Sequence, residues 1–539
     1  MALKPNLLQR LREASIERRV ADGTRLLDQA AHSIRNLQSG DPQIATLSLC
    51  VAEWIDVGYK DISLLDELLT HFTAAHRSAM PLRDYLLLQI CSAFRAMLSE
   101  DADTAIELLG FVLKVERELG DPHCLAIAHF WKGRSHRKKG EYETALHHIV
   151  EARKLAQQMN ALQMAAAIQI QEAWLLFQKG SPKEALRLFD LAERQLKHTD
   201  DALSLANIES ARGRIVRRAG EYAEALEHYQ RAISIFSEHD ATHRNLARVL
   251  VNAAYVKRLV ALHLRKRIDS RATRANARKS GRVSQDGSHH IRYAQLCHEA
   301  LEQLRQAGEI YALHHHHGGT GSVLVNAGYL HLDRGDIGQA EAQAQKAYEL
   351  AEPRNDHILM ARARTLEALV ENMRVEEQLG EDADVAVYAN NARRFAEDAV
   401  SLAKHTQNRR LLAAATIVRG ITYANDFFQE WEEAKQCAAQ ASTMLQPEDR
   451  DYLWEDLIQL KSRVLRSSGI DETLRAWSEG MVGEKTFQQI TEEFAEIVIP
   501  KVWLRESKKI SRVAERLSVS PKKVRRVLRN TGLLDRARE

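Results

Sequence analysis

Proline and glycine are scarce in this sequence. Its 539 residues include only 9 Pro and 25 Gly, whereas Ala, Leu, Glu, Arg and Gln are abundant. This composition excludes collagen-like and low-complexity chains, and it disfavours β sandwiches and barrels, which need many turns. The length allows three or four compact domains or one long array of repeats. We therefore expect an all-α protein.

Long apolar runs are absent as well. Hydrophobic residues make up 45% of the chain, yet no stretch of 18 consecutive apolar residues occurs. We expect no membrane-spanning helix. The first 19 residues carry scattered charges and lack the apolar segment of a secretion signal, so we do not expect secretion.

Cysteines are few and widely spaced. None belongs to a CxxC pair, and neighbouring cysteines are 33 or more residues apart, at Cys50, Cys91, Cys124, Cys297 and Cys437. An odd number at this spacing predicts buried free thiols in a reducing, cytoplasmic setting.

Motifs that carry chemistry are lacking too. GGTGS (Gly318–Ser322) lacks the Lys of a phosphate-binding loop, and we interpret it as a plain loop. Four consecutive histidines, His314–His317, point in different directions at a helix end, and no nearby Cys or carboxylate completes a metal site. We expect no catalytic activity, no cofactor and no bound metal.

Positive charge is concentrated in two segments. The whole chain carries 76 Lys and Arg against 73 Asp and Glu, a net charge of +3. Residues 501–539 carry +9 and residues 265–292 carry +7, so the remainder carries −13. Such concentrated positive charge indicates a partner rich in phosphate or acidic groups.

A forty-residue repeat organises the middle of the chain. A Gly followed five positions later by Ala recurs at Gly140, Gly180 and Gly220, and one step further back lies Glu100, followed by Ala105. Apolar and small residues recur at helical spacing on both sides of this position. The pattern predicts two helices joined by a turn at which Gly adopts a positive φ.

Residue size along the repeat indicates how the two helices pack. Small residues on both sides of the turn allow a close approach, and larger ones fill the next layer. The small residues are Gly133, Ala173, Gly213, Ala145, Ala185 and Ala225, and the larger ones are Ile149, Phe189 and Tyr229. This arrangement resembles the tetratricopeptide repeat in a forty-residue bacterial form, although an aromatic of that pattern is missing in several units. The resemblance implies a right-handed superhelical solenoid with a concave groove.

Further units extend the array in both directions. LVNAAY (Leu250–Tyr255) is echoed by LVNAGY (Leu324–Tyr329). We expect degenerate helical repeats over 1–99, the tetratricopeptide-like array over 100–446, and connecting helices over 447–484. A basic insertion at 265–290 separates the two helices of one unit. It has few large apolar residues, which predicts a mobile projecting loop.

Residues 485–539 have their own pattern. Residues 510–517 predict a short helix and residues 518–520 a turn, and Pro521 after a Ser cap begins a second helix with Val524, Val527 and Leu528 on its inner face. The segment resembles the Fis-type helix-turn-helix at the C-termini of bacterial transcription regulators, through its A-x-x-L-x-V-S core and closing T-G-L-L. Ser518 stands where that pattern prefers Gly, and a left-handed Ser costs about 1 kcal/mol.

The resemblance implies that the second helix enters the major groove of DNA. The candidate DNA-binding residues are Lys508, Lys509, Ser520, Lys522, Lys523, Arg525, Arg526 and Arg529. A helix pair of this kind can also be a protein-binding bundle.

An apolar stripe precedes the helix-turn-helix. Phe487, Ile490, Phe494 and Ile497 share one helix face, and we expect Pro500 to end or kink that helix. The stripe either packs against the helix-turn-helix or forms a homodimer, which would match two DNA half-sites.

The concave face of the array is the second candidate site. In tetratricopeptide arrays the first helix of each unit lines the groove. By that resemblance the candidate partner-binding residues are Arg134, Arg137, Lys138, Trp174, Phe177, Arg214, Arg217, Arg218, Arg248, Arg258, Asn326 and Tyr329. They form either a solvated charged surface or a groove that holds an acidic peptide or protein segment.

The sequence thus favours a cytoplasmic, bacterial, DNA-binding transcription regulator whose repeat body binds a regulatory protein or peptide. One alternative is a non-catalytic adaptor scaffold that binds proteins through its groove and basic tail. Another is nucleic-acid binding, including RNA, through the insertion.

Overall fold

The computed structural model describes residues 6–277, 286–377, 382–446, 449–467, 477, 480, 485–531 and 533–534. Every regular element in these ranges is a helix, so the predicted all-α class is confirmed. The chain divides into two compact units, unit 1 (Met1–Leu460) and unit 2 (Lys461–Glu539). None of the described helices is long and apolar enough to cross a membrane. All five cysteines are buried and free, as expected.

Unit 1 begins with helices of irregular length. They are α1 (Leu7–Ile16), α2 (Val20–Arg35), α3 (Ile44–Val57), α4 (Ile62–Thr70), α5 (Ala74–Ala79), α6 (Leu82–Leu98), α7 (Ala102–Lys114) and α8 (Glu116–Leu119). Trp54 of α3 is fully buried in this region. A Cβ atom placed on Gly23 of α2 would overlap its ring, so α2 and α3 pack together only because position 23 is Gly.

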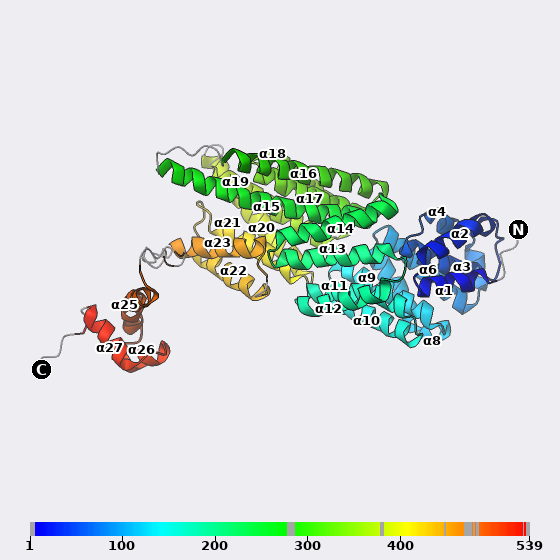
Figure 1. Cartoon of the computed structure of the whole chain (residues 1–539), viewed down its shortest axis with the longest axis horizontal. Helices are drawn as coiled ribbons and strands as arrows, with labels where there is room; N and C mark the ends of the chain where they lie inside the picture. The colour runs from blue at the N-terminus through cyan, green and yellow to red at the C-terminus, as the bar shows by residue number, and fades with distance from the viewer. Residues whose placement is uncertain are drawn as a thin grey trace. The chain divides into compact units, whose positions relative to one another are not determined.

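Paired antiparallel helices follow in a regular series (Figure 1). The first pairs are α9 (Pro122–Lys139) with α10 (Tyr142–Gln158), α11 (Leu162–Gln178) with α12 (Pro182–Leu196), and α13 (Ala202–Arg218) with α14 (Tyr222–Asp240). The later helices are α15 (Arg244–Ala277), α16 (Asp286–Leu313), α17 (His317–Asp333), α18 (Ile337–Ala351), the 3-10 turn η1 (Glu352–Arg354), α19 (His357–Glu376), α20 (Asp382–Lys404), α21 (Arg409–Tyr423), α22 (Trp431–Met444) and α23 (Tyr452–Ser467).

The odd-numbered helices form an inner layer. Each contacts its own pair partner, and from α11 to α21 each odd-numbered helix also contacts the next one. The even-numbered helices cover them on the outside. This two-layer stack is the solenoid that the forty-residue period predicts.

The turns of the repeats have the predicted backbone. The φ angles of Gly140, Gly180 and Gly220 are 81°, 95° and 87°, and Glu100, one period earlier, has a φ of 65°. The close helix approach is also confirmed, because a Cβ atom on Gly213 would lie 2.7 Å from the buried ring of Tyr229.

Late segments of unit 1 contact residues at or beside the turns of early repeats. The backbone N–H of Gln407 donates to the carbonyl of Gly140 (3.0 Å), and that of Arg450 donates to the carbonyl of Arg218 (2.7 Å). The Glu100 carboxylate accepts hydrogen bonds from the backbone N–H of Gly318 at 3.2 and 3.3 Å. Each of these contacts joins residues more than 200 positions apart, so late helices of unit 1 lie beside the early repeats.

Two predicted loops in unit 1 are wrong in part. Within the insertion at 265–290, α15 extends to Ala277 and α16 begins at Asp286, so most of the predicted loop is helical. Residues 278–285 lie outside the described residues. GGTGS (Gly318–Ser322) lies in the first turns of α17, capped by His316, whose side chain accepts from the Gly319 N–H (2.8 Å). Its glycines serve packing, since a Cβ atom on Gly321 would overlap Leu359.

Unit 2 contains α25 (Phe487–Arg505), α26 (Ile510–Arg516) and α27 (Pro521–Asn530). The helices share a core of Ala495, Ile499, Trp503, Val513, Ala514, Val524, Val527 and Leu528. Of the two predicted effects of Pro500, ending the helix or kinking it, the first is wrong, because α25 continues to Arg505 with Pro500 inside it. Ser518 has a φ of 50°, and the Ser520 hydroxyl caps α27, both as expected.

Candidate functional site

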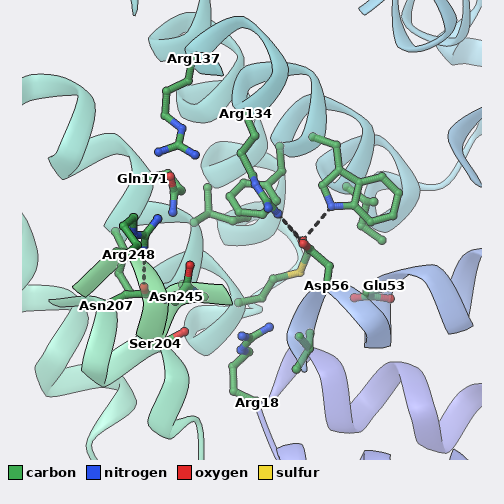
Figure 2. Close-up of a pocket in the computed structure, with 18 residues that line it drawn as sticks. Arg18, Glu53, Asp56, Arg134, Arg137, Gln171, Ser204, Asn207, Asn245 and Arg248 are labelled. Carbon is green, nitrogen blue, oxygen red and sulfur yellow. Dashed lines mark hydrogen bonds and ion pairs between the residues drawn. The ribbon is translucent and has the colours of Figure 1, made fainter. Parts of the chain in front are cut away.

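The inner layer of unit 1 encloses three adjoining cavities, which together we call the groove. The first cavity, of about 160 Å³, is lined by residues of α3, α9, α11, α13 and α15 and by Arg18, which lies between α1 and α2 (Figure 2). A narrow throat of about 20 Å³ follows, and it shares Arg137, Gln171 and Arg248 with the first cavity. The main cavity, of about 580 Å³, shares Arg214 and Arg248 with the throat. The groove is therefore one basic channel with a constriction.

The structure brings together nearly all of the candidate groove residues. Arg134 and Arg137 line the first cavity, and Trp174 and Arg214 line the throat. The main cavity is lined by Phe177, Arg217, Arg218, Arg258, Asn326 and Tyr329. Lys138 alone lies elsewhere, at a separate cavity of about 810 Å³, where it pairs with Glu100 (3.0 Å).

Two of these arginines are held by carboxylates. Arg134 pairs with Asp56 at 2.5 Å, and Asp56 also accepts a hydrogen bond from the Trp131 indole (2.9 Å). Arg258 is buried and forms an ion pair with Asp333. Their charges are already neutralised within the protein, so both residues stabilise the walls of the groove.

Other groove arginines lie against aromatic rings. Arg137 lies 5.0 Å from the centre of the Trp174 ring, and Arg217 lies 5.0 Å from that of Tyr255. Arg218 stacks on Phe177 at 3.8 Å and donates to its carbonyl (3.2 Å). The face of an aromatic ring attracts a guanidinium but carries no net negative charge, so these arginines keep their positive charge available for a ligand.

Burial lowers the pKa of several groove arginines, and repulsion from neighbouring arginines adds to the effect. It lowers the pKa of Arg137 to about 10, with Arg134 and Arg214 adding repulsion. It lowers the pKa of Arg248 to about 9, with Arg214 and Arg137 adding repulsion. Both shifts indicate cations that lack a counter-charge in the folded protein.

Sequence reasoning missed further groove residues. Gln171, Asn207, Asn252, Tyr255, Tyr311, Arg362, Arg410, Tyr452 and Asp456 also line the cavities. Asn252 and Tyr255 were detectable, because LVNAAY repeats the LVNAGY motif that contains Asn326 and Tyr329. Asp456, on α23, is a half-buried acid whose pKa desolvation raises to about 8, against the opposing effect of Arg258.

Among the described residues no group of three or more His, Cys, Asp or Glu side chains is arranged to hold a metal ion. His316 lies 3.5 Å from Glu100, and Glu100 also pairs with Lys138, so these side chains serve the contact between α17 and the early repeats.

Unit 2 presents a basic face on α27. Lys522, Arg525, Arg526 and Arg529 are all exposed, whereas Lys523 is half-buried. Arg526 pairs with Glu492 of α25 at 3.2 Å. Of the remaining candidates, Lys508 lies over the Trp503 ring at 5.7 Å, Lys509 is exposed, and Ser520 accepts the N–H of Lys523 at 3.2 Å.

The apolar stripe on α25 does not pack against the other two helices. Phe487 is 85% exposed and Phe494 is 48% exposed, whereas Ala495, Ile499 and Trp503 supply the packed face of α25. Packing against the helix pair, one of the two interpretations of the stripe, is therefore wrong.

Comparisons with known proteins agree with the repeat fold. The model of the tetratricopeptide repeat family matches residues 204–261. The chain is similar to a Rap protein solved with Competence and Sporulation Factor, at 12% identity and a TM-score of 0.50, over 74% of this chain and 98% of that one. Among curated protein sequences there is no match.

Two further solved structures have lower TM-scores. One is the apo form of the quorum sensor NprR from B. thuringiensis (13% identity, TM-score 0.36, 82% of this chain and 98% of that one). The other is a human IFIT1 dimer with m7Gppp-AAAA (12% identity, TM-score 0.39, 92% and 96%). The family match and the Rap structure support the tetratricopeptide-like solenoid of unit 1.

Proposed function

We propose that this protein is a DNA-binding transcription regulator whose repeat groove binds an acidic peptide or protein segment. The observation that carries the proposal is the groove itself, a partly open channel lined by arginines, several of which have no acidic partner. Tetratricopeptide arrays are a fold that presents extended concave binding surfaces. An acidic segment would supply the missing negative charge and find aromatic faces beside it.

The DNA-binding half of the proposal rests on unit 2. A short helix, a tight turn and a second helix capped by Ser520 share one core, and the second helix exposes Lys522, Arg525 and Arg529. Basic side chains on one face of a helix can reach phosphates and base edges in a major groove together.

We expect the double variant Lys522→Ala, Arg525→Ala to bind duplex DNA at least about tenfold more weakly and with a shallower salt dependence. Both side chains are exposed, so folding should be unaffected. The measurement is fluorescence anisotropy of a labelled duplex at several salt concentrations.

Lys183→Ala, Arg187→Ala is the matched control. These exposed basic residues lie on α12 of unit 1, and their removal takes away the same charge. Equal weakening by both double variants would show that binding depends on net charge and that α27 does not recognise DNA.

We also propose that the α25 stripe is a homodimer interface, because its aromatic side chains are left exposed and one recognition helix contacts only one half-site. Phe487→Glu, Phe494→Glu is expected to give a monomer in sedimentation analysis. Gln488→Glu changes an exposed residue on another face of the same helix, and this variant should remain a dimer. A monomeric unaltered protein at micromolar concentration would contradict the proposal.

A non-catalytic adaptor scaffold is the second candidate function, favoured by the fold and by the aromatic and basic lining of the groove. It predicts a bound protein segment in the groove and no affinity of α27 for DNA. The DNA measurement above separates the two functions.

A further inference from the structure

Three guanidinium groups from three inner helices meet at the throat of the groove. Arg137 lies on α9, Arg214 on α13 and Arg248 on α15, and all three line the throat. Figure 2 shows Arg137 and Arg248 with Gln171 of α11 between them. Each comes from a different repeat, so the superhelical stacking of the array brings them together.

These cations have few partners within the protein. Arg248 donates one hydrogen bond, to Asn207 at 2.7 Å. The Nε atoms of all three arginines and the side-chain oxygen of Gln171 are buried and without a hydrogen-bond partner. No carboxylate among the described residues forms an ion pair with any of the three, in contrast to the nearby Arg134 with Asp56.

Such an arrangement is unfavourable without a counter-ion. A partly buried cation without an ion-pair partner has lost part of its hydration, and the single hydrogen bond from Arg248 to Asn207 compensates little of that loss. Here the three also repel one another, which is one reason why the pKa of Arg248 is lowered to about 9. An anionic group in the throat would accept several charge-assisted hydrogen bonds at once.

The shape of the throat selects the kind of anion. Its volume of about 20 Å³ fits a group of about the size of one water molecule, and it opens on one side to a cavity of about 160 Å³ and on the other to one of about 580 Å³. A longer ligand can therefore lie in the main cavity and place one small anionic group in the throat. Amide side chains of Asn207, Asn252 and Gln171 line the cavities beside the throat.

We propose that Arg137, Arg214 and Arg248 form an anion subsite that binds one carboxylate of an acidic peptide, while the rest of the peptide lies in the adjoining main cavity. The inference rests on the proposed peptide-binding function and names the group that the throat recognises. The carboxylate can come from an Asp or Glu side chain or from a peptide C-terminus.

Calorimetric titration of the full-length chain with three tetrapeptides tests this subsite. The probes are acetyl-tetraglutamate amide, acetyl-tetraglutamine amide and acetyl-tetraglutamine with a free C-terminal carboxylate. We expect the first to bind and the second not to bind. Binding of the third as tightly as the first would identify a C-terminal carboxylate as the recognised group, and absence of its binding would identify a side chain.

Arg214→Met and Arg248→Met are expected to weaken tetraglutamate binding at least about tenfold, because each removes one of the three cations. The exposed Arg187→Met, on α12, should bind as the unaltered chain does. Undiminished binding by both throat variants would overturn the subsite and leave the groove proposal intact. No binding by the unaltered chain would overturn both.

Thermal unfolding without ligand gives a second readout. Arg214 has no hydrogen-bond partner for its Nε atom and no acidic neighbour, so Arg214→Met should leave the melting temperature unchanged or raise it. A fall of several degrees would show that Arg214 supports the fold, and would contradict the inference.

Discussion

Replacing Gly220 by Val is expected to destabilise unit 1 by about 3 kcal/mol. The φ angle of Gly220 is 87°, which a β-branched residue adopts only with strain. A Cβ atom there would also lie 3.0 Å from the carbonyl oxygen of Arg450, in the segment that donates a hydrogen bond to the carbonyl of Arg218. The measurement is urea unfolding followed by circular dichroism, together with the rate of proteolysis.

Gly335→Val is the matched control. Gly335 occupies the same turn of a later repeat, with a φ of 83°, but a Cβ atom there meets no atom within 4 Å. It should therefore suffer the backbone strain alone and cost about 1 kcal/mol less than Gly220→Val. Equal losses would show that the contact between Gly220 and Arg450 contributes nothing.

Arg258→Met is expected to cost about 3–5 kcal/mol of unfolding free energy. The Arg258 side chain is 3% exposed and pairs with Asp333 of α17, and its guanidinium lies over the rings of Tyr329 (4.6 Å) and Tyr452 (5.3 Å). Its removal leaves the Asp333 carboxylate, itself 13% exposed, without its counter-charge. The loss should appear in the urea midpoint.

A second substitution distinguishes the lost ion pair from lost packing. Arg258→Met combined with Asp333→Leu removes both charges, and it should recover at least about half of the stability that Arg258→Met loses. If the double variant is no more stable than Arg258→Met, then the orphaned Asp333 is not the cause of the loss.

Local features of the fold were predictable from the sequence. Gly140, Gly180 and Gly220 repeat at a period of forty, and a short turn before an amphipathic helix requires the positive φ that they adopt. Gly213 is small and Tyr229 is large because the two helices cross at this point and the Tyr229 ring fills the space beside Gly213. Likewise Ser520 and Pro521 mark the beginning of α27 by local chemistry alone.

Features that depend on distant contacts were not predictable in the same way. Nothing near Gly140 in the sequence indicates the hydrogen bond from Gln407, and nothing near Glu100 indicates Gly318. These contacts enclose the groove and bring α23, with Tyr452 and Asp456, to its wall. A single sequence carries no signal for pairs so far apart.

The composition of the insertion and of GGTGS led to wrong predictions of loops. Residues 265–277 are polar and basic, which is typical of a loop, yet they extend α15, because Arg and Lys are good helix formers and the helix is already nucleated by the buried turns before them. Glycines at 318, 319 and 321 suggested a loop, but they lie at a helix start, where Tyr311 leaves no room for a side chain at position 319 and Leu359 leaves none at position 321.

We propose above all that this chain binds specific DNA sequences through α27. Selection of bound duplexes from a random-sequence library by the full-length protein, followed by sequencing, tests it most directly. We predict enrichment of a common motif, with two half-sites if the α25 stripe forms a dimer, and loss of that motif in the Lys522→Ala, Arg525→Ala variant. A selection that enriches no motif, or one that the variant enriches equally well, would contradict the account.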